Sequence, residues 1–387
     1  MNKGRKRTSR RSTESSAIFL DLNNLMEFRH LSFAQFVRFA IVFTIGKGED
    51  PFDKPIDNPS AILGNVKGFV DSLISDVEER YKKVSNSRSR KALETEKEEL
   101  KKILAKMNSD QEEALNTEFF MDYEFKEYVR IWGGRGKAVR DILKTRSYML
   151  GLYELGMYLT RIARGGRNDK GAFLLVEPSY YLHYYKVLDV DGFRKFYLGI
   201  RDFMKYHEEI QRQGGNHKLG ETAFLTLLSG LAIDKLFELL FKLLRDKHGY
   251  DQIYDEIMNL INNGALVLYR VSESGTTPYD LTNLAKVVLK MRAVDALADI
   301  AKSLQTYHSG GRHDIENYVA NLANIVGGNI FAYAISKDLH HIYYTVRSIA
   351  AGSFDEDMNK ALGAEGWAKL KSKLLSMRVI AWQKELQ

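Results

Sequence analysis

YDLTNLAKVVLKMRAVDALADIAKSL, residues 279–304, is the stretch that decides most about the fold of this chain. From Leu281 to Leu304 its apolar residues recur at intervals of three and four, which is the spacing of one face of an amphipathic helix. Pro278 precedes the stretch, and Asp280 or Thr282 can cap its first turn. The pattern therefore predicts one long helix over residues 281–304.

Two more helices are predicted after this one. The sequence YHSGGRH, residues 307–313, breaks the apolar pattern, and a second helix is expected from Asp314 to the glycine pair at 327–328. A third helix is expected over 339–349, where apolar residues again follow helical spacing. Three helices joined by short glycine-marked breaks are typical of a helical bundle, and no catalytic motif lies within this one.

The same region resembles a known family. YDLTNLAK (279–286), a glycine-rich break and LHHIYYTVRSI (339–349) are similar in order and size to the C-terminal helical region of archaeal large subunits of type I CRISPR–Cas surveillance (Cascade) complexes, closest to the type I-A form. The resemblance covers about the last third of the chain and is one of pattern, without an invariant motif. Such large subunits usually open with a β-strand, whereas this sequence predicts a basic tail followed by helices.

The rest of the chain predicts a mainly α, multi-helix bundle protein with a small β element of two or three strands. Apolar spacing predicts the helices, and short apolar runs bounded by turn residues predict the strands. Helices are expected over residues 31–43, 135–163, 191–213, 220–247 and 250–263. Two further long helical segments are expected from 60 to 106, with a break at 85–87, and an acidic helix is expected to begin at a capping box over 109–112. Strands are expected at 172–176 and 265–271. Residues 91–106 are rich in Lys and Glu with few apolar anchors, so this segment is expected to form a solvated or protruding arm of a helical hairpin.

These elements suggest four regions along the chain. They are a disordered basic tail at 1–16, an N-terminal helical domain with the protruding hairpin at 17–171, a central α domain with short strands at 172–278, and a C-terminal helical bundle at 279–387. A chain of 387 residues is long enough to build two or three such domains, each with its own core.

Composition excludes several classes of protein. The absence of cysteine rules out disulfides, thiolate metal sites and cysteine nucleophiles. No run approaches the roughly 20 consecutive apolar residues of a membrane span, and Asp21 interrupts the short apolar run that follows the basic tail. We therefore expect a cytoplasmic protein without a membrane partner. Abundant Lys, Glu and Arg with only 5 prolines are compatible with a thermophilic source.

Charge is unevenly distributed. Residues 1–12 carry six bases and no acid, out of a net charge of +7 for the whole chain, so the tail is either a phosphate-binding arm or a solubilising or targeting extension. Residues 110–127 hold seven acids against one base, and residues 135–170 hold nine bases against three acids. These blocks could pair with each other, or could present an acidic face to proteins and a basic face to nucleic acid. We favour the second interpretation.

Four loops combine two glycines with basic residues, at 133–137, 165–170, 214–218 and 310–313. Glycine lets the backbone approach a phosphate, while Arg, Lys and Asn bind phosphates and base edges. Each loop alone is commonly a turn between helices, but four of one kind favour at least one contact with nucleic acid. The candidate nucleic-acid-binding residues are Arg135, Lys137, Arg140, Arg164, Arg167, Asn168, Lys170, Asn216, His217, Lys218 and Arg312.

The sequence predicts no catalytic residue, metal ligand or cofactor. A nucleotide-binding P-loop ending at Lys137 would need glycine where Ile131 stands and Ser or Thr where Ala138 stands. His313–Asp314 resembles the metal-binding pair of phosphohydrolases but lacks further ligands in the sequence, so Asp314 is interpreted as a helix N-cap. His340 and His341 are adjacent and would point about 100° apart on a helix. The tyrosines at 180–185 are assigned to packing rather than base stacking.

The sequence thus predicts a non-catalytic, nucleic-acid-associated subunit of a larger ribonucleoprotein. The Cascade resemblance implies that the large subunit contacts guide RNA, reads the short PAM in target DNA, and recruits the helicase–nuclease alongside the other Cascade subunits. It also implies that residues 167–170 or 216–218 are candidates for contact with the PAM or the backbone. Two alternatives stay open, namely a nucleocapsid-like protein that coats RNA and a helical scaffold that binds proteins only.

Overall fold

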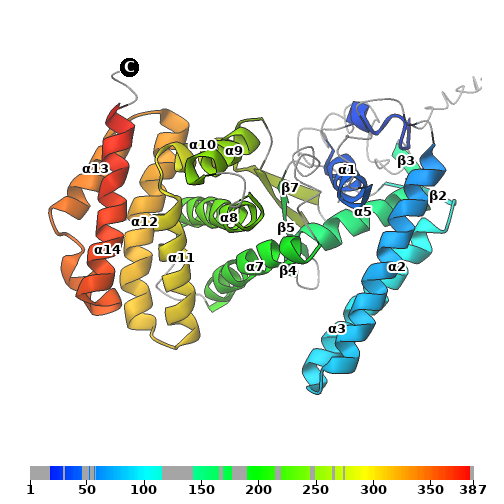
Figure 1. Cartoon of the computed structure of the whole chain (residues 1–387), viewed down its shortest axis with the longest axis horizontal. Helices are drawn as coiled ribbons and strands as arrows, with labels where there is room; N and C mark the ends of the chain where they lie inside the picture. The colour runs from blue at the N-terminus through cyan, green and yellow to red at the C-terminus, as the bar shows by residue number, and fades with distance from the viewer. Residues whose placement is uncertain are drawn as a thin grey trace, which may run out of the picture. The chain divides into compact units, whose positions relative to one another are not determined.

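The computed structural model describes residues 18–28, 31–45, 52, 56, 58–115, 143–164, 169–176, 190–213, 219–244, 249–263, 266–272 and 275–383. Within these residues the protein is mainly α, with twelve α-helices, one short 3-10 helix and two small β-sheets of three and four strands (Figure 1). The predicted mainly α fold with a small β element is confirmed, although the described strands number seven rather than two or three.

The elements follow one another along the chain as follows. The helices are η1 (Leu25–Phe28), α1 (Ser32–Ile45), α2 (Pro59–Lys83), α3 (Ser87–Met107), α5 (Ser147–Thr160), α7 (Val190–Gln213), α8 (Glu221–Leu244), α9 (Tyr250–Asn263), α10 (Thr282–Lys290), α11 (Val294–Ser309), α12 (His313–Ser336), α13 (His340–Ala350) and α14 (Asp355–Gln383). The strands are β1 (Ile18–Leu20), β2 (Glu112–Ala114), β3 (Leu143–Arg146), β4 (Arg161–Arg164), β5 (Asp169–Val176), β6 (Leu266–Ser272) and β7 (Gly275–Asp280). The first described element is thus a strand, not the helix that the sequence predicts after the tail.

The chain divides into two compact units. Unit 1 is built from the described residues of 1–37 and 55–155, and unit 2 from those of 38–54 and 156–387. The boundaries that the sequence suggests at 171–172 and 278–279 both lie inside unit 2. The basic tail, residues 1–16, lies outside the described residues.

Unit 1 contains the three-stranded sheet, in the order β1-β3-β2. Strand β3 pairs in parallel with β1 and antiparallel with β2, and the buried Thr145 hydroxyl donates a 2.8 Å hydrogen bond to the carbonyl of Leu20. The predicted capping box at 109–112 is wrong, because its last residue lies in strand β2, where Glu112 pairs with Arg146. Of the helix predicted over 135–163, residues 147–160 form α5 as expected, but 143–146 form strand β3, in which alternate side chains are buried, and 161–164 form β4.

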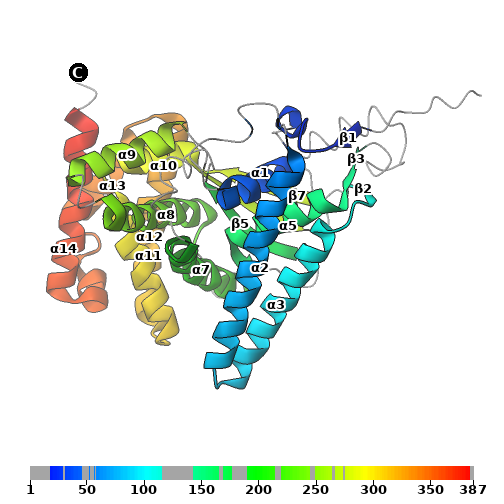
Figure 2. The same ribbon diagram turned by 45° about the vertical axis from the view of Figure 1, so that its right-hand side comes forward.

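Helices α2 and α3 form a hairpin that runs side by side along its whole length (Figure 2). The two helices predicted on either side of residues 85–87 are therefore present, and the Asn86 side chain caps α3 by accepting from the amide of Arg88 at 2.8 Å. Buried residues occur up to Val77 on α2 and from Leu100 on α3, with none between. Consequently the inner half of the hairpin belongs to the core of unit 1, and its outer half projects into solvent.

Unit 2 contains the four-stranded sheet, in the order β4-β5-β6-β7, with all neighbours antiparallel. The strands predicted at 172–176 and 265–271 are confirmed as parts of β5 and β6. Strand β7 was not predicted, since it contains Pro278, which cannot donate to a ladder. The structure places this proline on the edge strand of the sheet, where proline is tolerated.

Helix α8 lies at the centre of the helical part of unit 2 and contacts α7, α9, α10, α11 and α12. A Cβ atom added to Gly327 of α12 would lie 2.8 Å from the Ala223 Cα of α8, so the two backbones pass very close together. The prediction that a helix ends at 327–328 is therefore wrong, because Gly327 permits close packing and α12 continues to Ser336.

The helix predicted over 281–304 is two helices, α10 and α11, separated at Arg292, whose φ is +50°. At its start, the Asp280 carboxylate accepts from the amide of Thr282 at 2.8 Å, although Leu281 occupies the N-cap position. The predicted helices 191–213, 220–247, 250–263 and 339–349 are confirmed as α7, α8, α9 and α13.

Among the described helices, α12 is the one long and apolar enough to cross a membrane by composition. Its buried residues, from Ile315 to Ala334, lie within the bundle, where α12 contacts α8, α11, α13 and α14. Helices that are apolar on several faces are typical of the centre of a bundle, and α12 packs against several helices of unit 2.

Candidate functional site

Most of the predicted nucleic-acid-binding residues lie outside the described residues, namely Arg135, Lys137, Arg140, Arg167, Asn168, Asn216, His217 and Lys218, as do the tyrosines at 180–185. Lys170 lies in β5, where the backbone is described. Arg164 is exposed at the end of β4, and Arg312 is exposed directly before α12, with its guanidinium 5.5 Å from the ring centre of Tyr307.

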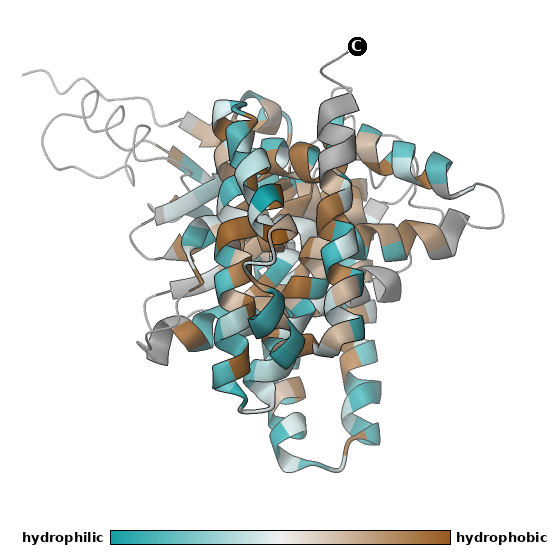
Figure 3. Cartoon of the chain, turned by 90° about the vertical axis from the view of Figure 1, so that its left-hand side faces the viewer, coloured by the Kyte–Doolittle hydropathy of each residue, from teal (hydrophilic) through white to brown (hydrophobic). Residues whose placement is uncertain are grey.

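A different basic surface stands out in unit 1, at the end of the α2–α3 hairpin. We call residues 81–92 the hairpin tip. The tip contains five basic residues and no acidic one, and all five are exposed: Lys82, Lys83, Arg88, Arg90 and Lys91. Figure 3 shows this end of the hairpin as mostly hydrophilic. The tip therefore carries a local charge of +5 on a projecting element.

Little of this charge is neutralised by neighbouring acids. Lys83 makes a long 3.7 Å ion pair with Glu79, and both side chains are about three-quarters exposed, so water screens the pair strongly. Among the described residues, Lys82, Arg88 and Lys91 make no ion pair. The positive charge of the tip is accordingly available to an anionic partner.

One aromatic residue lies among these bases. The Arg90 guanidinium stands 5.7 Å from the ring centre of Tyr81, and its Nε donates a 2.6 Å hydrogen bond to the carbonyl of Val84. Tyr81 is 38% exposed, which leaves part of the ring in contact with solvent. An exposed aromatic face beside cations is the combination that stacks bases while binding phosphates.

Two of the acids next to the tip, Glu78 and Glu96, are paired with bases outside it. Arg80 bonds Glu96 at 3.0 Å, and Lys97 bonds Glu78 at 2.6 Å. The hydrogen bond and charge of Lys97 lower the pKa of Glu78 below its usual value. The hairpin thus has a region of paired acids and bases next to a tip whose charged residues are all basic. The solvated arm was predicted from the sequence but the tip was not, although the sequence contains its signal, a run of five bases from 82 to 91 without an acid.

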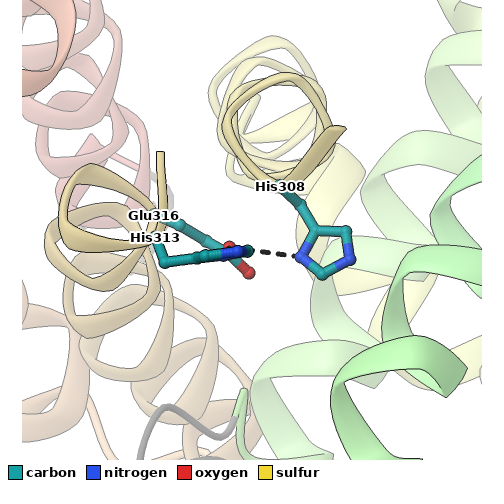
Figure 4. Close-up of side chains that lie close together, drawn as sticks. All are labelled: His308, His313 and Glu316. Carbon is teal, nitrogen blue, oxygen red and sulfur yellow. Dashed lines mark hydrogen bonds and ion pairs between the residues drawn. The ribbon is translucent and has the colours of Figure 1, made fainter. Parts of the chain in front are cut away.

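A second cluster of functional side chains lies in unit 2, where α11 meets α12. His308 is in the last turn of α11, and His313 and Glu316 are in the first turn of α12 (Figure 4). Glu316 Oε2 lies 3.2 Å from His308 Nδ1 and 3.0 Å from His313 Nδ1. We call these three residues the His–Glu cluster. Gly311, with a φ of +67°, forms the turn that brings the two helix ends together.

The cluster differs in exposure from one side to the other. The side chains of Glu316 and His308 are 6% and 12% exposed, whereas that of His313 is 60% exposed. On the inner side, Glu209 of α7 lies 3.3 Å from His308 Nε2, and the Tyr206 ring meets the His308 ring edge-on. Burial, followed by the nearby charge of Glu316, raises the pKa of the Tyr206 hydroxyl. The cluster is therefore buried at His308 and Glu316 and open to solvent at His313.

His313 is partnered by Glu316 and not by Asp314, the neighbour that the sequence suggests. The prediction that Asp314 is a helix N-cap is wrong, because α12 begins at His313, Arg312 occupies the N-cap position and Asp314 lies exposed in the first turn. His308, His313 and Glu316 come together across the break between α11 and α12. Their spacing in the sequence is H-x4-H-x2-E. The i, i+3 pair of His313 and Glu316 is readable from the sequence, but the approach of His308 depends on the turn at 310–312. His340, by contrast, bonds Asp338 at the surface.

Comparisons with known proteins add no neighbour to this picture. No protein-family model matches the chain, and neither the curated proteins nor the solved structures give a significant match. The candidate sites are therefore judged on their own geometry.

Proposed function

We propose that this protein is a non-catalytic nucleic-acid-binding subunit, and that the hairpin tip is one of its contacts with the phosphate backbone. The observation that supports this function is the set of five exposed bases at the end of a projecting hairpin, with no acid among them. Lys and Arg that neutralise phosphates release condensed counterions, and this release supplies most of the affinity for nucleic acid of any sequence.

The form of the hairpin suits a backbone contact more than base reading. The tip is reached through two packed helices, so its bases are presented on a firm support away from the rest of unit 1. Its bases are exposed, as groups that contact phosphate oxygens must be. Tyr81 beside Arg90 adds a stacking face that tolerates any base. We therefore propose that the tip holds single-stranded or duplex nucleic acid without strong sequence preference.

The resemblance of residues 279–349 to Cascade large subunits extends the proposal to an assembly. In this proposal the protein works in the cytoplasm with guide RNA, target DNA and other Cascade subunits, and contributes to PAM recognition and recruitment of the helicase–nuclease. Residues 167–170 and 216–218 are the proposed PAM-reading loops, and the hairpin tip is a separate, sequence-independent contact.

The first test removes the charge of the tip. We expect the triple variant Lys82→Gln, Arg88→Gln, Lys91→Gln to bind single-stranded and duplex DNA roughly tenfold more weakly near physiological salt, and to lower the salt slope by about 2 to 3. Glutamine keeps a high helix propensity, so α2 and α3 are retained. The matched control is Lys67→Gln, Lys101→Gln, Lys102→Gln, which removes three charges from the inner half of the same hairpin. Equal losses in both variants would show that the tip has no special role.

The second test addresses the assembly and the absence of catalysis. Protein purified from its native host is expected to bring a small guide RNA of uniform 5′ end and a fixed set of partner proteins. The isolated protein is expected not to cleave DNA or RNA in Mg²⁺ or Mn²⁺. Recovery of heterogeneous RNA coated by many copies of this chain would instead identify a nucleocapsid-like protein, and metal-dependent cleavage would contradict the non-catalytic function.

A further inference from the structure

We propose that the His–Glu cluster is a binding site for a zinc-class divalent cation, held by His308 Nδ1, His313 Nδ1 and Glu316 Oε2, which clamps the end of α11 to the start of α12. The ligand atoms of these three side chains all lie within 4.8 Å of one another, and no other such group of histidines and carboxylates occurs among the described residues. The proposal concerns unit 2 alone and is independent of the nucleic-acid contact proposed for the hairpin tip.

The spacing of the ligand atoms is close to that of a tetrahedral site. Two ligand atoms that each lie about 2.0–2.1 Å from a tetrahedral zinc ion are about 3.3 Å apart. The two measured separations from Glu316 Oε2 are 3.2 Å to His308 Nδ1 and 3.0 Å to His313 Nδ1. The third separation, between the histidine nitrogens, lies within 4.8 Å, and the exposed His313 side chain can close it by rotation.

The hydrogen-bonding balance around His308 also favours a cation. Its Nδ1 faces the carboxylate of Glu316 and its Nε2 faces the carboxylate of Glu209, at 3.2 and 3.3 Å. A neutral imidazole carries one N–H and can donate to one of these carboxylates, which leaves the other facing a lone pair. A cation between Nδ1 and Glu316 removes the conflict, since Nδ1 then binds the metal and Nε2–H donates to Glu209.

That arrangement is the usual support of a metal-binding histidine. A carboxylate that accepts the second N–H of the imidazole fixes the orientation and tautomer of the ring, and the 3.3 Å contact from Glu209 is placed to do so. Glu209 comes from α7, a third helix, so the site would join α7, α11 and α12.

A buried carboxylate and a buried hydroxyl provide a further, independent indication. The side chain of Glu316 is 6% exposed, and among the described residues its ion-pair or hydrogen-bond partners include histidines but no Lys or Arg. Tyr206 is 3% exposed, and its hydroxyl lies beside Glu316 without forming a well-aligned hydrogen bond. A buried negative charge next to a polar group that lacks a good partner is costly unless a positive charge completes the site.

The ligand types select the class of metal. Two imidazole nitrogens and one carboxylate oxygen suit Zn²⁺ or Co²⁺, whereas Mg²⁺ and Ca²⁺ prefer sites made of oxygen ligands. Three protein ligands leave one tetrahedral position for water, on the side where His313 is exposed. We assign the site to Zn²⁺ and use Co²⁺ as its spectroscopic probe.

The experiment uses tag-free, full-length protein treated with EDTA and then dialysed. Calorimetric titration with Zn²⁺ is expected to show one site per chain, and Co²⁺ is expected to give the intense visible absorption of a tetrahedral complex, which Zn²⁺ abolishes. An excess of Zn²⁺ of about 100-fold over the dissociation constant should raise the Tm of unit 2 by roughly 5 °C. Mg²⁺ should have no such effect.

Two variants separate metal binding from a simple hydrogen-bonded cluster. Glu316→Gln keeps the shape of the side chain and an acceptor for the histidines, but loses the anionic ligand, so the affinity for Zn²⁺ should fall at least 100-fold. His313→Gln alters an exposed residue and should lower the affinity without loss of folding, as checked by circular dichroism. The control is His340→Gln with His341→Gln, a histidine pair on α13 outside the cluster.

These measurements can either support or overturn the proposed zinc site. Loss of Zn²⁺ binding in Glu316→Gln and His313→Gln, with unchanged binding in the α13 control, supports the site. Failure of the unaltered protein to take up Zn²⁺ at micromolar concentration overturns it and leaves the three side chains as a hydrogen-bonded cluster. Unchanged binding in both cluster variants overturns it equally, because the metal would then be bound elsewhere.

Discussion

The outer half of the α2–α3 hairpin and the crossing of α8 with α12 are both made of paired helices, yet they are held together in opposite ways. Residues 78–99 of the hairpin contain no buried side chain, and ion pairs such as Lys97–Glu78 join the two helices. At the α8–α12 crossing, Gly327 and Ala223 bring the backbones into contact, and the Thr226 hydroxyl donates to the carbonyl of Gly327 at 3.0 Å.

The difference shows where this protein can change without loss of the fold. Surface ion pairs contribute little to stability, so the outer half of the hairpin depends on its helical propensity. Its side chains can therefore serve binding without loss of the fold. A crossing of close-packed backbones has no room for an added atom, because protein interiors are packed as densely as organic crystals. Three measurements test this contrast, from the largest expected effect to the smallest.

The largest effect is expected at the crossing. In Gly327→Val, the added Cβ atom would lie 2.8 Å from the Ala223 Cα and 3.2 Å from its carbonyl oxygen, and two methyl groups would extend beyond it. Because the obstacle is backbone, α12 must shift, and we expect a loss of about 3 kcal/mol or more in the free energy of unfolding of unit 2. Urea unfolding followed by circular dichroism measures the loss.

The neighbouring glycine provides the control for this prediction. A Cβ atom on Gly328 meets its nearest neighbour, the Thr222 hydroxyl, at 3.8 Å, which is ordinary contact. Gly328→Ala should therefore stabilise α12 by about 0.5–1 kcal/mol through its better helix propensity. If the two substitutions had similar effects, close packing would not be the reason that Gly327 is required.

A somewhat smaller effect is expected from charge in the same core. His207 of α7 is 3% exposed and stacks on Phe224 of α8 with 3.7 Å between ring centres. Burial, helped by the charge of Arg270, lowers the pKa of His207 from 6.5 to about 4. The folded state therefore resists protonation, so stability present above pH 6.5 is lost as the pH falls toward 4, and we expect His207 to account for about 2 to 3 kcal/mol of that loss.

The variant His207→Phe tests this assignment, because it keeps the stacked ring and removes the titrating group. The free energy of unfolding, measured by urea at pH 7 and at pH 4, should fall less in the variant than in the unaltered protein. Parallel losses in the unaltered protein and in His207→Phe would contradict the prediction.

The smallest effect is expected in the hairpin. Replacing residues 78–99 by a short Gly–Ser linker removes the tip and the flanking ion pairs, yet should change the free energy of unfolding of unit 1 by less than about 1 kcal/mol. By comparison, Ile103→Ala in the inner half removes a side chain that is 2% exposed and should cost about 3 kcal/mol. A large loss in the free energy of unfolding on removal of the outer half would show that it supports the core of unit 1. The outer hairpin and the α8–α12 crossing would then not differ in the expected way.

Local sequence patterns predicted a large part of the fold. The stripes that became α7, α8, α9 and α13, and the apolar runs that became β5 and β6, are each specified by residues within one element. The candidate sites were less predictable. The basic run of the hairpin tip is visible in the sequence, but its significance depends on exposure, which the packing of α2 on α3 determines.

What the sequence by itself determined is therefore the helical class, the approximate place of most helices, the two inner strands of the larger sheet and the basic charge of the hairpin tip. The tertiary structure alone decided whether Gly327 ends a helix or lets one pass, whether Pro278 excludes a strand or marks a sheet edge, and which partners His308 meets. Each of these depends on what lies across from a residue in space. Periodicity records only which face of an element is apolar, whereas steric fit, ladder position and hydrogen-bond partners arise when segments distant in the chain come together.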